Sequence, residues 1–546
     1  MKKKLIIYST GLVSSILLFL ASCNSLDLAP TDQFTDLNYW TSVDKASSVL
    51  SMAYSQMFGA NYYFANERLS DNLYEDRGNS DEKVFTAGQA DPALGRFANE
   101  WKDCYEGIKT CHTFLENVDR VPNMDETLKA RMKAEARFIR AFLYFRLTTQ
   151  YGDVPLFDRN LSLAEATVLF RTPKSEVVDF VRKELNDIVS ILPAKQGYSA
   201  ADNGRITKAA VMTLLARTYL YENDWTNTAA NCEKIMNGDY GQYSLFPSYE
   251  GLFLQGTDAK YADKYNSENI LDIGYALNTS RTWSEYYDAI PLSVGGRISA
   301  FAPTQELVND YVMLNGKGIG ESGSGYDESN PYVNRDPRFK YTIVYHGYPW
   351  KKSDGTTATI YIQPGSSKTA GVAATDEYVG PGQNTTATGY YLRKWYDPNA
   401  PQGMASGLNL YLMRYADVLL MYAEAKNELG QMNESIWNKT IRPIRERAGF
   451  TDASALNYPS SDLRNIIRRE RRCELALEGL RLFDIRRWKT IETVMNGTPH
   501  GAKFAADNTQ YIQLGLRKFD PSRNYLFAVP QSQRDIDPNL TQNPGY

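Results

Sequence analysis

Residues with the chemistry for catalysis or metal binding are few and scattered in this 546-residue chain. The three histidines, His112, His346 and His500, stand far apart, and no HExxH motif or cysteine pair at metal-binding spacing accompanies them. No GxSxG nucleophile motif occurs. A GxGxxG match at residues 318–323 lacks the preceding strand and following helix that a dinucleotide site requires. We therefore predict no catalytic residues, no metal site and no cofactor.

Carboxylate pairs leave one enzymatic alternative open. Glycoside hydrolysis needs two carboxyl groups at a defined separation in space. The chain has 64 acidic residues, and the sequence singles out no pair among them. A surface glycoside hydrolase therefore remains an alternative, and so does a structural calcium, although no EF-hand spacing is present.

Aromatic side chains that lie near polar ones are the best candidates for ligand binding. The chain holds 38 tyrosines and 8 tryptophans, and a flat ring can cover the apolar face of a sugar while polar neighbours bind its hydroxyls. Packing in a minor core is the alternative for each cluster. Three clusters fall in predicted loops: Tyr62 and Tyr63 with Asp71 and Arg77; Trp283 with Tyr286 and Tyr287; and Trp350 with His346 and Tyr348.

The elements that must position these side chains are mainly helices. Apolar residues recur at three- and four-residue steps over long stretches, and Gly or Pro often ends them. Pairs of such stretches predict a scaffold of helix hairpins of tetratricopeptide type, without a clean 34-residue repeat. Helices are predicted over residues 44–58, 97–118, 124–151, 174–192, 208–221, 226–237, 305–313, 411–429, 436–448 with a break near Pro443, and 462–483.

Two regions lack this period. Residues 239–405 are rich in Gly, Ser, Thr, Asn, Pro and Tyr, and short strands are predicted within them, for example at 341–345 and 357–362. Residues 491–546 are also mostly irregular. We therefore predict a mainly α fold over residues 41–546, whose scaffold spans about 41–238 and 406–490 and whose irregular region spans 239–405.

The N-terminus has the features of a lipoprotein signal. Three lysines are followed by an apolar run from Leu5 to Leu20 and by Ala21-Ser22-Cys23. The run is short and is interrupted by polar residues, which argues against a membrane span. We predict a signal peptide over residues 1–22, lipidation of Cys23 and a tether over residues 23–40. This arrangement predicts a mature protein that starts at Cys23 and is held outside the cytoplasm on a lipid tether.

The other cysteines and the net charge of the chain argue against a disulfide-bonded protein and against a nucleic-acid-binding protein. Cys104, Cys111, Cys232 and Cys473 are scattered, so we predict buried thiols that behave as small hydrophobes. The net charge is −4 and becomes more negative once the three N-terminal lysines are removed. Nucleic acid is therefore not an expected partner, since phosphate binding requires a basic surface.

A charged helical segment at residues 468–487 has two interpretations. Arg471 with Glu474, and Glu478 with Arg481, are i,i+3 pairs of opposite charge. They indicate an ion-paired helix that supports the scaffold, with a charged binding face as the alternative.

Four sequence blocks point to a known family. They are YGDVPL at 151–156, RYADVLLMYAEA at 414–425, RRERRCELALEG at 468–479 and DPNLTQNPGY at 537–546. In this order behind a lipobox, they resemble the SusD/RagB family of Bacteroidetes outer-membrane lipoproteins, which serve nutrient uptake. The resemblance covers essentially the whole mature chain.

The resemblance implies both a fold and a partner. Members have four helix pairs of tetratricopeptide type and a ligand site in the irregular region. They cover a SusC-like TonB-dependent transporter as a lid, and most studied members bind glycans, while some bind peptides. Asp71 and Arg77 fall where some glycan-binding members place polar contacts.

We therefore expect a non-catalytic cell-surface lipoprotein that captures an oligosaccharide or polysaccharide and passes it to a SusC-like transporter. A peptide-binding member of the family, a surface glycoside hydrolase and an adaptor without a soluble ligand are the alternatives. The expected ligand-binding residues are Tyr62, Tyr63, Asp71, Arg77, Trp283, Tyr286, Tyr287 and Trp350.

Overall fold

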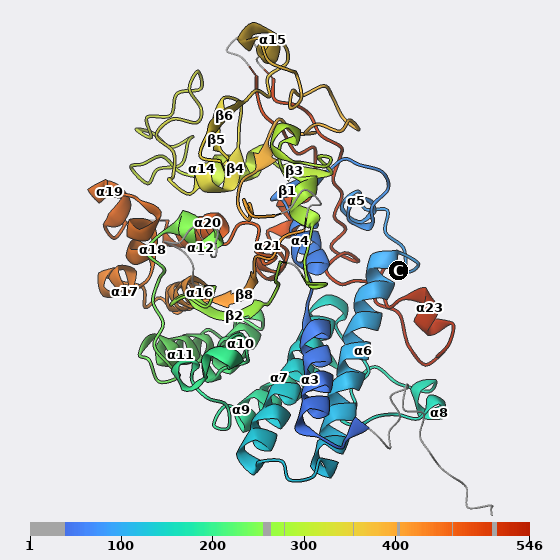
Figure 1. Cartoon of the computed structure of the whole chain (residues 1–546). Coiled ribbons are helices and arrows are strands. Elements are labelled where there is room, and N and C mark those ends of the chain that lie inside the picture. The colour runs from blue at the N-terminus through green and yellow to red at the C-terminus, as the bar shows by residue number, and fades with distance from the viewer. Residues whose placement is uncertain are drawn as a thin grey trace, which may run out of the picture.

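The structure, a computed structural model, has helices in its lower part, and short strands and long irregular segments in its upper part (Figure 1). The predicted signal peptide, residues 1–22, the predicted lipidation site Cys23 and nearly all of the predicted tether lie outside the described residues. No described helix is long and apolar enough to cross a membrane. The described residues are 39–254, 264–277, 279–352, 354–400, 405–460, 462–504 and 510–546.

The scaffold is built from helices that pack against their neighbours in sequence. Helix α3 packs on α6, α6 on α7, α7 on α9 and α10 on α11, and α11 then packs on α16 and α16 on α20. These helices are α3 (Val43–Met57), α6 (Gly95–Asn117), α7 (Glu126–Tyr151), α9 (Lys174–Ile188), α10 (Lys208–Tyr221), α11 (Trp225–Met236), α16 (Tyr415–Glu428) and α20 (Leu463–Glu474). The predicted mainly α scaffold is confirmed.

Local sequence explains where these helices begin and end. The Ser42 side chain accepts a hydrogen bond from the Lys45 N–H at the start of α3, and Thr207 caps α10 in the same way. Gly152, with φ of 74°, follows the last residue of α7. Each helix buries residues at three- and four-residue steps, such as Val49, Leu50 and Ala53 in α3.

The shorter helices lie mostly in connections and in the upper and outer parts. They are α4 (Ala60–Arg68), α5 (Asp81–Thr86), α8 (Leu163–Ala166), α12 (Tyr249–Leu254), α13 (Gln305–Asp310), α14 (Phe339–Thr342), α15 (Ser366–Ala370), α17 (Glu434–Lys439), α18 (Ile441–Ala448), α19 (Ala453–Leu456), α21 (Arg481–Arg487), α22 (Ile491–Val494) and α23 (Gln531–Arg534).

Within the described ranges, the strands form four separate antiparallel pairs. Three pairs join residues that are distant in sequence, and only β5 and β6 form a local hairpin. The pairs are β1 (Leu73–Glu75) with β3 (Phe301–Pro303), β2 (Asn269–Ile273) with β8 (Leu410–Arg414), β4 (Ile343–Val344) with β7 (Tyr391–Leu392), and β5 (Tyr348–Lys351) with β6 (Thr357–Ile360).

Of two further predicted helices, one is shorter in the structure and one is divided. The helix expected over 411–429 starts only at Tyr415, because residues 411–414 belong to strand β8. The helix expected over 436–448 breaks at Thr440, as the proline predicts. Pro443 has no N–H to bond the carbonyl of Lys439, and its ring would clash with that carbonyl in a continuous helix.

Two other expectations are wrong. The helix predicted over 462–483 ends at Glu474 and a new helix begins at Arg481, with Leu477 and Gly479 between them at positive φ. The segment around Tyr62 and Tyr63 was expected to be a loop, but it forms helix α4.

A buried network of ion pairs joins the scaffold to the upper part. The guanidinium of Arg414 contacts Glu268 Oε1 at 2.6 Å, Glu474 Oε1 at 2.7 Å and Glu478 Oε1 at 2.7 Å. Arg338, from the upper part, contacts the other carboxylate oxygen of Glu474 at 3.0 Å. The predicted i,i+3 partners are wrong: Arg471 pairs with Asp417 and Asp484, and Arg481 with Asp71, instead of with Glu474 and Glu478. The charges of this segment pair with distant residues and in that way support the scaffold.

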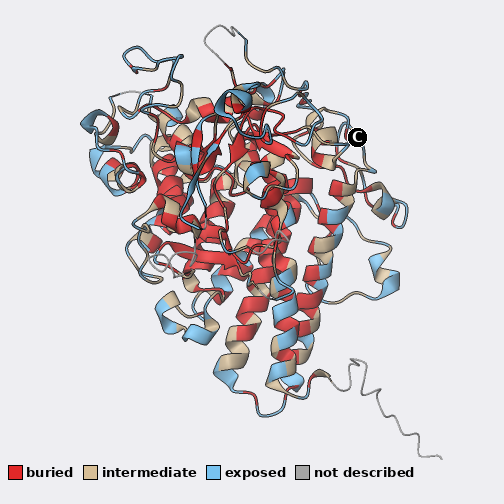
Figure 2. Cartoon of the chain, turned by 45° about the horizontal axis from the view of Figure 1, so that its top comes forward, coloured by how far each residue is buried: buried red, intermediate tan, exposed pale blue. Residues whose placement is uncertain are grey.

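The hydrophobic core is continuous between the two parts. Buried residues extend from the helices into the strands and irregular segments (Figure 2). The four cysteines that the structure describes are buried and unpaired, as predicted. The fold therefore presents its irregular segments on a rigid base.

Candidate ligand-binding site

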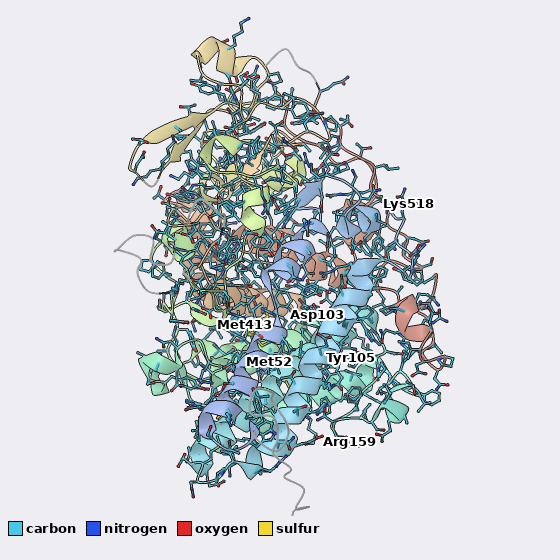
Figure 3. The ribbon with its side chains drawn as sticks, turned by 45° about the vertical axis from the view of Figure 1, so that its right-hand side comes forward. Met52, Asp103, Tyr105, Arg159, Met413 and Lys518 are labelled. Carbon is cyan, nitrogen blue, oxygen red and sulfur yellow. The ribbon has the colours of Figure 1, made fainter. Side chains whose placement is uncertain are left out.

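The first predicted cluster lies inside the protein. The Tyr62 hydroxyl donates to Asp103 Oδ2 on α6 at 2.6 Å, and Figure 3 marks Asp103. The ring of Tyr63 is 1% exposed and lies 5.9 Å from that of Trp395. The expectation that Tyr62 and Tyr63 form an exposed loop surface is wrong, because α4 turns both rings into the core.

The polar members of that cluster also have structural partners. Asp71 is 2% exposed, and its carboxylate is paired with Arg481 and Arg472. Arg77 is half-buried and donates to Asn384 Oδ1 at 2.5 Å. Asp71 is therefore not available on a binding surface, whereas Arg77 remains partly accessible.

The second and third clusters are buried too. Trp283 Nε1 donates to the Leu408 carbonyl at 2.8 Å, and the Tyr286 hydroxyl donates to the carbonyl of Arg393 at 3.1 Å. Tyr287 and Trp350 are 6% and 0% exposed. Trp283, Tyr286, Tyr287 and Trp350 therefore pack in the core, and the exposed aromatic surface expected from them is not formed.

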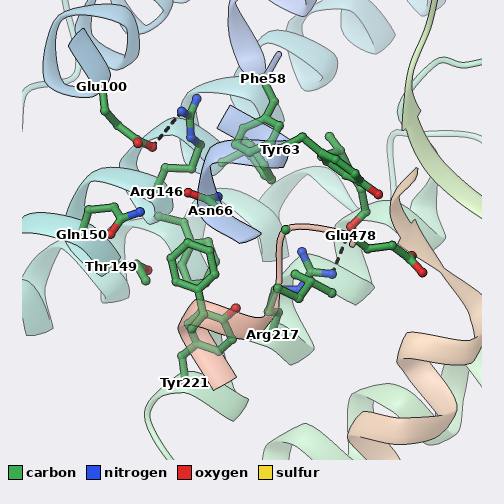
Figure 4. Close-up of a pocket in the computed structure, with 16 residues that line it drawn as sticks. Phe58, Tyr63, Asn66, Glu100, Arg146, Thr149, Gln150, Arg217, Tyr221 and Glu478 are labelled. Carbon is green, nitrogen blue, oxygen red and sulfur yellow. Dashed lines mark hydrogen bonds and ion pairs between the residues drawn. The ribbon is translucent and has the colours of Figure 1, made fainter. Parts of the chain in front are cut away.

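A small cavity is lined in part by the predicted residue Tyr63. It is lined by Tyr63, Phe58, Tyr221 and the paired side chains of Glu100 and Arg146, which meet at 2.8 Å (Figure 4). Its volume is about 60 Å³. Ligand pockets commonly measure about 300–1,000 Å³, so this space suits a few water molecules and not a sugar.

A larger pocket lies in the upper part, with a volume of about 400 Å³. We call it the tyrosine pocket. Its walls come from the start of α13, the segment 326–333, the turn between β4 and β5, residues beside β6 and β7, and the C-terminal part of the chain. The lining residues are Gln305, Tyr326, Glu328, Ser329, Asn330, Pro331, Tyr332, Val333, Tyr345, His346, Gln363, Tyr390, Lys503, Phe504 and Tyr511.

Stacked rings form one side of this pocket. The rings of Tyr332 and Tyr345 are 4.3 Å apart at an interplanar angle of 25°, and Phe339 lies 5.3 Å from Tyr345 at 7°. Tyr332 and Tyr345 are half-buried, as are Tyr326 and Tyr511. The pocket therefore offers aromatic surface that is held in place and remains partly accessible.

Arg335 holds the segment that carries Tyr326 and Tyr332. Its guanidinium donates to the carbonyl oxygens of Pro331 at 2.6 Å, Val308 at 2.5 Å and Tyr311 at 2.7 Å. The same group lies 5.7 Å from the ring centre of Tyr326. This buried arginine thus fixes the wall of the pocket through the main chain.

Hydrogen-bonding groups surround the rings. The Tyr390 hydroxyl donates to Gln305 Oε1 at 2.6 Å. His346 Nδ1 accepts from the N–H groups of Ile362 and Gln363 at 3.1 and 3.2 Å, so its proton is assigned to Nε2. Burial lowers the pKa of His346, which favours this neutral form. The imidazole is therefore a hydrogen-bond donor at neutral pH.

One ion pair crosses the pocket wall. Lys503 Nζ lies 2.7 Å from Glu328 Oε1, which joins the C-terminal part to the segment 326–333.

The pocket hydroxyl of Tyr332 is neutral, and the described lining of the pocket holds no metal-ligand cluster. Burial raises the pKa of Tyr332 to about 12, so its hydroxyl keeps its proton at neutral pH. No group of three or more potential metal-ligating His, Cys, Asp or Glu side chains occurs in the described part of the chain.

Most of the residues that line the tyrosine pocket were not singled out from the sequence. His346 belonged to the third predicted cluster, but Tyr326, Tyr332, Tyr345 and Tyr511 were not singled out. Most of the lining lies in the range 239–405, which was expected to carry the ligand site, and the rest lies in the C-terminal part, which was not. The abundance of tyrosine was the available signal, and it does not say which rings reach the surface.

Family comparisons agree with this architecture. The model of the SusD family matches residues 267–546. A second model, described as "Starch-binding associating with outer membrane", matches residues 26–220. Together the two matches extend over both the scaffold and the tyrosine pocket.

Individual proteins are similar over nearly the whole chain. SusD-like protein P2 of Formosa agariphila is 26% identical over 97% of this chain and 98% of its own. A SusD-like protein of Bacteroides ovatus is 26% identical over 89% and 83%. The crystal structure of a SusD-like carbohydrate-binding protein from Bacteroides fragilis superposes with a TM-score of 0.81 at 27% identity, covering 92% of this chain and 100% of that one. The chain therefore belongs to the SusD family.

Proposed function

We propose that the protein binds an oligosaccharide in the tyrosine pocket. The observation that carries this proposal is the combination of half-buried, stacked tyrosine rings with fixed polar groups around a space of about 400 Å³. Ligand pockets of about 300–1,000 Å³ with a few convergent polar groups are typical of small-molecule sites.

The pocket chemistry suits a sugar. The rings of Tyr326, Tyr332 and Tyr511 can cover the apolar C–H faces of pyranose units. The protonated Nε2 of His346 can donate to a hydroxyl, and the carboxylate of Glu328 can accept from one. Because Glu328 is neutralised by Lys503, the site favours an uncharged glycan over a strongly acidic one.

The same lining favours binding over hydrolysis. Glycosidases commonly use two carboxyl groups, about 5–10 Å apart, on either side of the scissile bond. Glu328 is the one acid among the described residues that line the tyrosine pocket. A second acid would have to come from elsewhere, so we propose a binding protein and not an enzyme.

Relatives support the ligand class. The B. fragilis protein at 27% identity is titled a carbohydrate-binding protein, and the second family model carries a starch-binding description. A laminarin-binding SusD-like protein shares the fold at 23% identity and a TM-score of 0.64, which bears on the fold alone. We infer from the first two that the ligand is a glycan rather than a peptide.

The cellular setting completes the proposal. Residues 1–23 carry the lipoprotein pattern, so we propose an outer-membrane protein that is lipid-anchored through Cys23 and faces the cell exterior. Membership of the SusD family supports a SusC-like TonB-dependent transporter as the partner that receives the glycan. Tethering next to this transporter would raise the local ligand concentration even if the pocket binds weakly.

Affinity electrophoresis through gels that each contain one polysaccharide tests this proposal. The mature chain is compared with the double variant Tyr326→Ala/Tyr332→Ala and with a matched control, Tyr240→Ala/Tyr458→Ala, which truncates two half-buried tyrosines outside the pocket. We expect one glycan to retard the wild type and the control but not the pocket variant. No new reducing ends should form.

Three results would contradict the proposal. Equal retardation of all three proteins would place the glycan outside the tyrosine pocket. Release of reducing sugar by the wild type would favour the hydrolase. An absence of retardation by every glycan, with peptide binding or transporter binding retained, would favour the peptide-binding or adaptor alternative.

A further inference from the structure

Two oppositely charged side chains of the tyrosine pocket meet at its wall, and they differ in how far they are enclosed. Lys503 and Glu328 both line the pocket. Lys503 Nζ lies 2.7 Å from Glu328 Oε1, and the two side chains are 18% and 57% exposed. The ammonium group is therefore the enclosed member of the pair, and the carboxylate is the exposed member.

The main chain that carries Lys503 is fixed to the rest of the fold. The Ala502 N–H donates to the Thr388 carbonyl at 2.6 Å, and the Ala502 carbonyl accepts from the Ile512 N–H at 3.1 Å. Lys503 Nζ also lies 5.9 Å from the ring centre of Tyr511, and an aromatic face attracts a cation. These contacts hold the lysine beside the pocket, and none of them involves a carboxylate.

Glu328, in contrast, stands on an exposed turn. The Asn330 N–H donates to the Asp327 carbonyl at 3.0 Å, and Glu328 lies between these two residues. The Asp327 carboxylate accepts from the Ser329 N–H at 2.9 Å and from the Asn330 amide at 2.7 Å, so it is engaged within the turn. Among the described residues that line the pocket, Glu328 is the one acid that can neutralise Lys503.

A second cation lies behind the same wall. Arg335 is 6% exposed, and its guanidinium donates to three carbonyl oxygens, which carry no net charge. Its neighbour Asp336 is paired with Arg338 at 2.7 Å. Since Arg335 also lies 5.7 Å from the ring centre of Tyr326, its positive charge acts on the pocket wall. Without the charge of Glu328, two cations and no acid of the described lining would act there.

The ring of Tyr511 senses all three charges. Burial and Glu328 raise the pKa of its hydroxyl, while Lys503 and Arg335 lower it, and the net result is a raised pKa. A charged group of a ligand that lies on Tyr511 would therefore interact with the same three side chains.

We propose that Glu328 determines the charge selectivity of the tyrosine pocket by keeping Lys503 paired. This inference rests on the proposed function, since it takes the pocket as a glycan site. While Glu328 is charged and in place, its carboxylate occupies the ammonium group that an acidic sugar would need. Loss of this one charge turns the same pocket into a site for glycans that contain uronic acids.

An acidic ligand meets two obstacles that a neutral ligand does not. It has to break the contact between Lys503 and Glu328, and its own charge then lies near the displaced carboxylate of Glu328. A hydrogen bond between a charged donor and a charged acceptor is stronger than one between neutral groups. The same ammonium group, once unpaired, therefore favours an anionic ligand.

Isothermal titration calorimetry of the mature chain with an oligosaccharide of galacturonic acid tests this proposal. Glu328→Gln removes the charge and keeps the size of the side chain. We expect this variant to bind the acidic oligosaccharide about fivefold more tightly than the wild type at low salt. The gain should disappear at about 1 M salt, where charges are screened over a few ångströms.

Glu126→Gln is a matched control. Glu126 is the 84% exposed member of a 2.8 Å pair with Lys129, which is 13% exposed. Both substitutions change the net charge by one unit, but Glu126 is the first residue of α7, in the lower part of the molecule (Figure 1). We expect no gain for this control. The double variant Glu328→Gln/Lys503→Met should also show none, because it lacks the ammonium group as well as the carboxylate.

Three results would overturn the proposal: no gain in affinity for Glu328→Gln, an equal gain for Glu126→Gln, or a gain that persists in the double variant. The proposed function fails on a different observation, namely that the wild type binds no neutral glycan in the tyrosine pocket. Because the gain is measured with the acidic oligosaccharide alone, each of the two failures can be recognised without the other.

Discussion

Asp71 and Arg481 form a two-point ion pair inside the protein, with Nε–Oδ1 and Nη2–Oδ2 distances of 2.7 and 2.9 Å. Arg472 approaches the same carboxylate at 2.9 Å. Burial alone would raise the pKa of Asp71, but Arg472 and Arg481 lower it well below its usual range. The carboxylate therefore joins the segment after α4 to α20 and α21, and this role is structural.

Replacing Asp71 should destabilise the fold without changing the pocket. Asp71→Asn leaves two buried arginines short of a counter-charge, so we expect the free energy of unfolding to fall by about 3 kcal/mol. Urea denaturation at pH 7 measures this loss. A matched control is Asp288→Asn, because Asp288 forms the same two-point pair with Arg297 near the surface, at 2.7 and 2.8 Å. There the expected loss is only about 0.5 kcal/mol, and equal losses for the two variants would contradict this account.

The stacking role of Tyr332 can be separated from that of its hydroxyl. Tyr332→Ala removes the ring that stacks on Tyr345, and we expect it to weaken binding of the glycan identified by electrophoresis by about tenfold. Tyr332→Phe keeps the ring and should change the affinity by no more than about twofold. Isothermal titration calorimetry measures both affinities. If Phe and Ala weaken binding equally, the hydroxyl and not the ring is what the ligand contacts.

Trp283 and Tyr286 should behave as core residues. Truncation of either to Ala leaves a large cavity and orphans a buried carbonyl that the side chain now bonds. We expect each variant to lose about 3–5 kcal/mol of stability. Thermal unfolding measures the loss, while glycan affinity of the protein that remains folded should stay unchanged. A specific loss of affinity with normal stability would restore these residues to the ligand site.

His112 should make the fold sensitive to mild acid. Its Nδ1 accepts from Arg140 at 3.2 Å, and burial together with Arg140 lowers its pKa to about 4. An unfolded histidine has a pKa near 6.5, so the unfolded chain takes up this proton first as the pH falls. Stability from this group is therefore complete above about pH 6.5 and is lost progressively towards pH 4, by about 3 kcal/mol.

The variant His112→Asn isolates this contribution, since the amide oxygen can still accept from Arg140 but does not titrate. We expect the difference in unfolding free energy between wild type and variant to shrink between pH 6.5 and pH 4. Urea denaturation at several pH values measures it. A difference that stays constant with pH would show that the pKa of His112 is the same in the folded and unfolded chain, which would contradict this account.

The four described cysteines should be unreactive in the native protein. Burial raises the pKa of Cys104 and Cys111 to about 12, and Cys232 and Cys473 are equally enclosed. The thiolate is the reactive form, so we expect no labelling by a thiol reagent until denaturant is added. Labelling of one site under native conditions would reveal a local opening of the surrounding helices.

The sequence predicts the scaffold well because residues within and next to each helix determine where that helix begins and ends. Residues 208–221 were predicted with the observed limits, since Thr207 caps the helix and apolar residues repeat through it. Residues 410–414 show the limit of this reasoning. The run Leu-Tyr-Leu-Met-Arg is apolar and short, and only pairing with the distant β2 makes it a strand.

The site was less accessible to prediction because exposure is a tertiary property. Tyr63 and Tyr332 look alike in sequence, since each lies two positions from an asparagine, yet α4 buries the first and Arg335 holds the segment of the second at a pocket wall. The walls of the tyrosine pocket also meet from positions as far apart as Gln305 and Tyr511. No local sequence pattern indicates that residues so far apart come together in the fold.

The way Arg335 holds its segment has a consequence for evolution. Its guanidinium donates hydrogen bonds to the main-chain carbonyl oxygens of Val308, Tyr311 and Pro331, and every amino acid supplies such an oxygen. Side chains in the segment 326–333 can therefore be substituted while the hydrogen bond from Arg335 to the main chain of this segment is kept. Under the proposed function, single substitutions in this segment can therefore change the lining of the tyrosine pocket without loss of the contacts that Arg335 makes to the main chain.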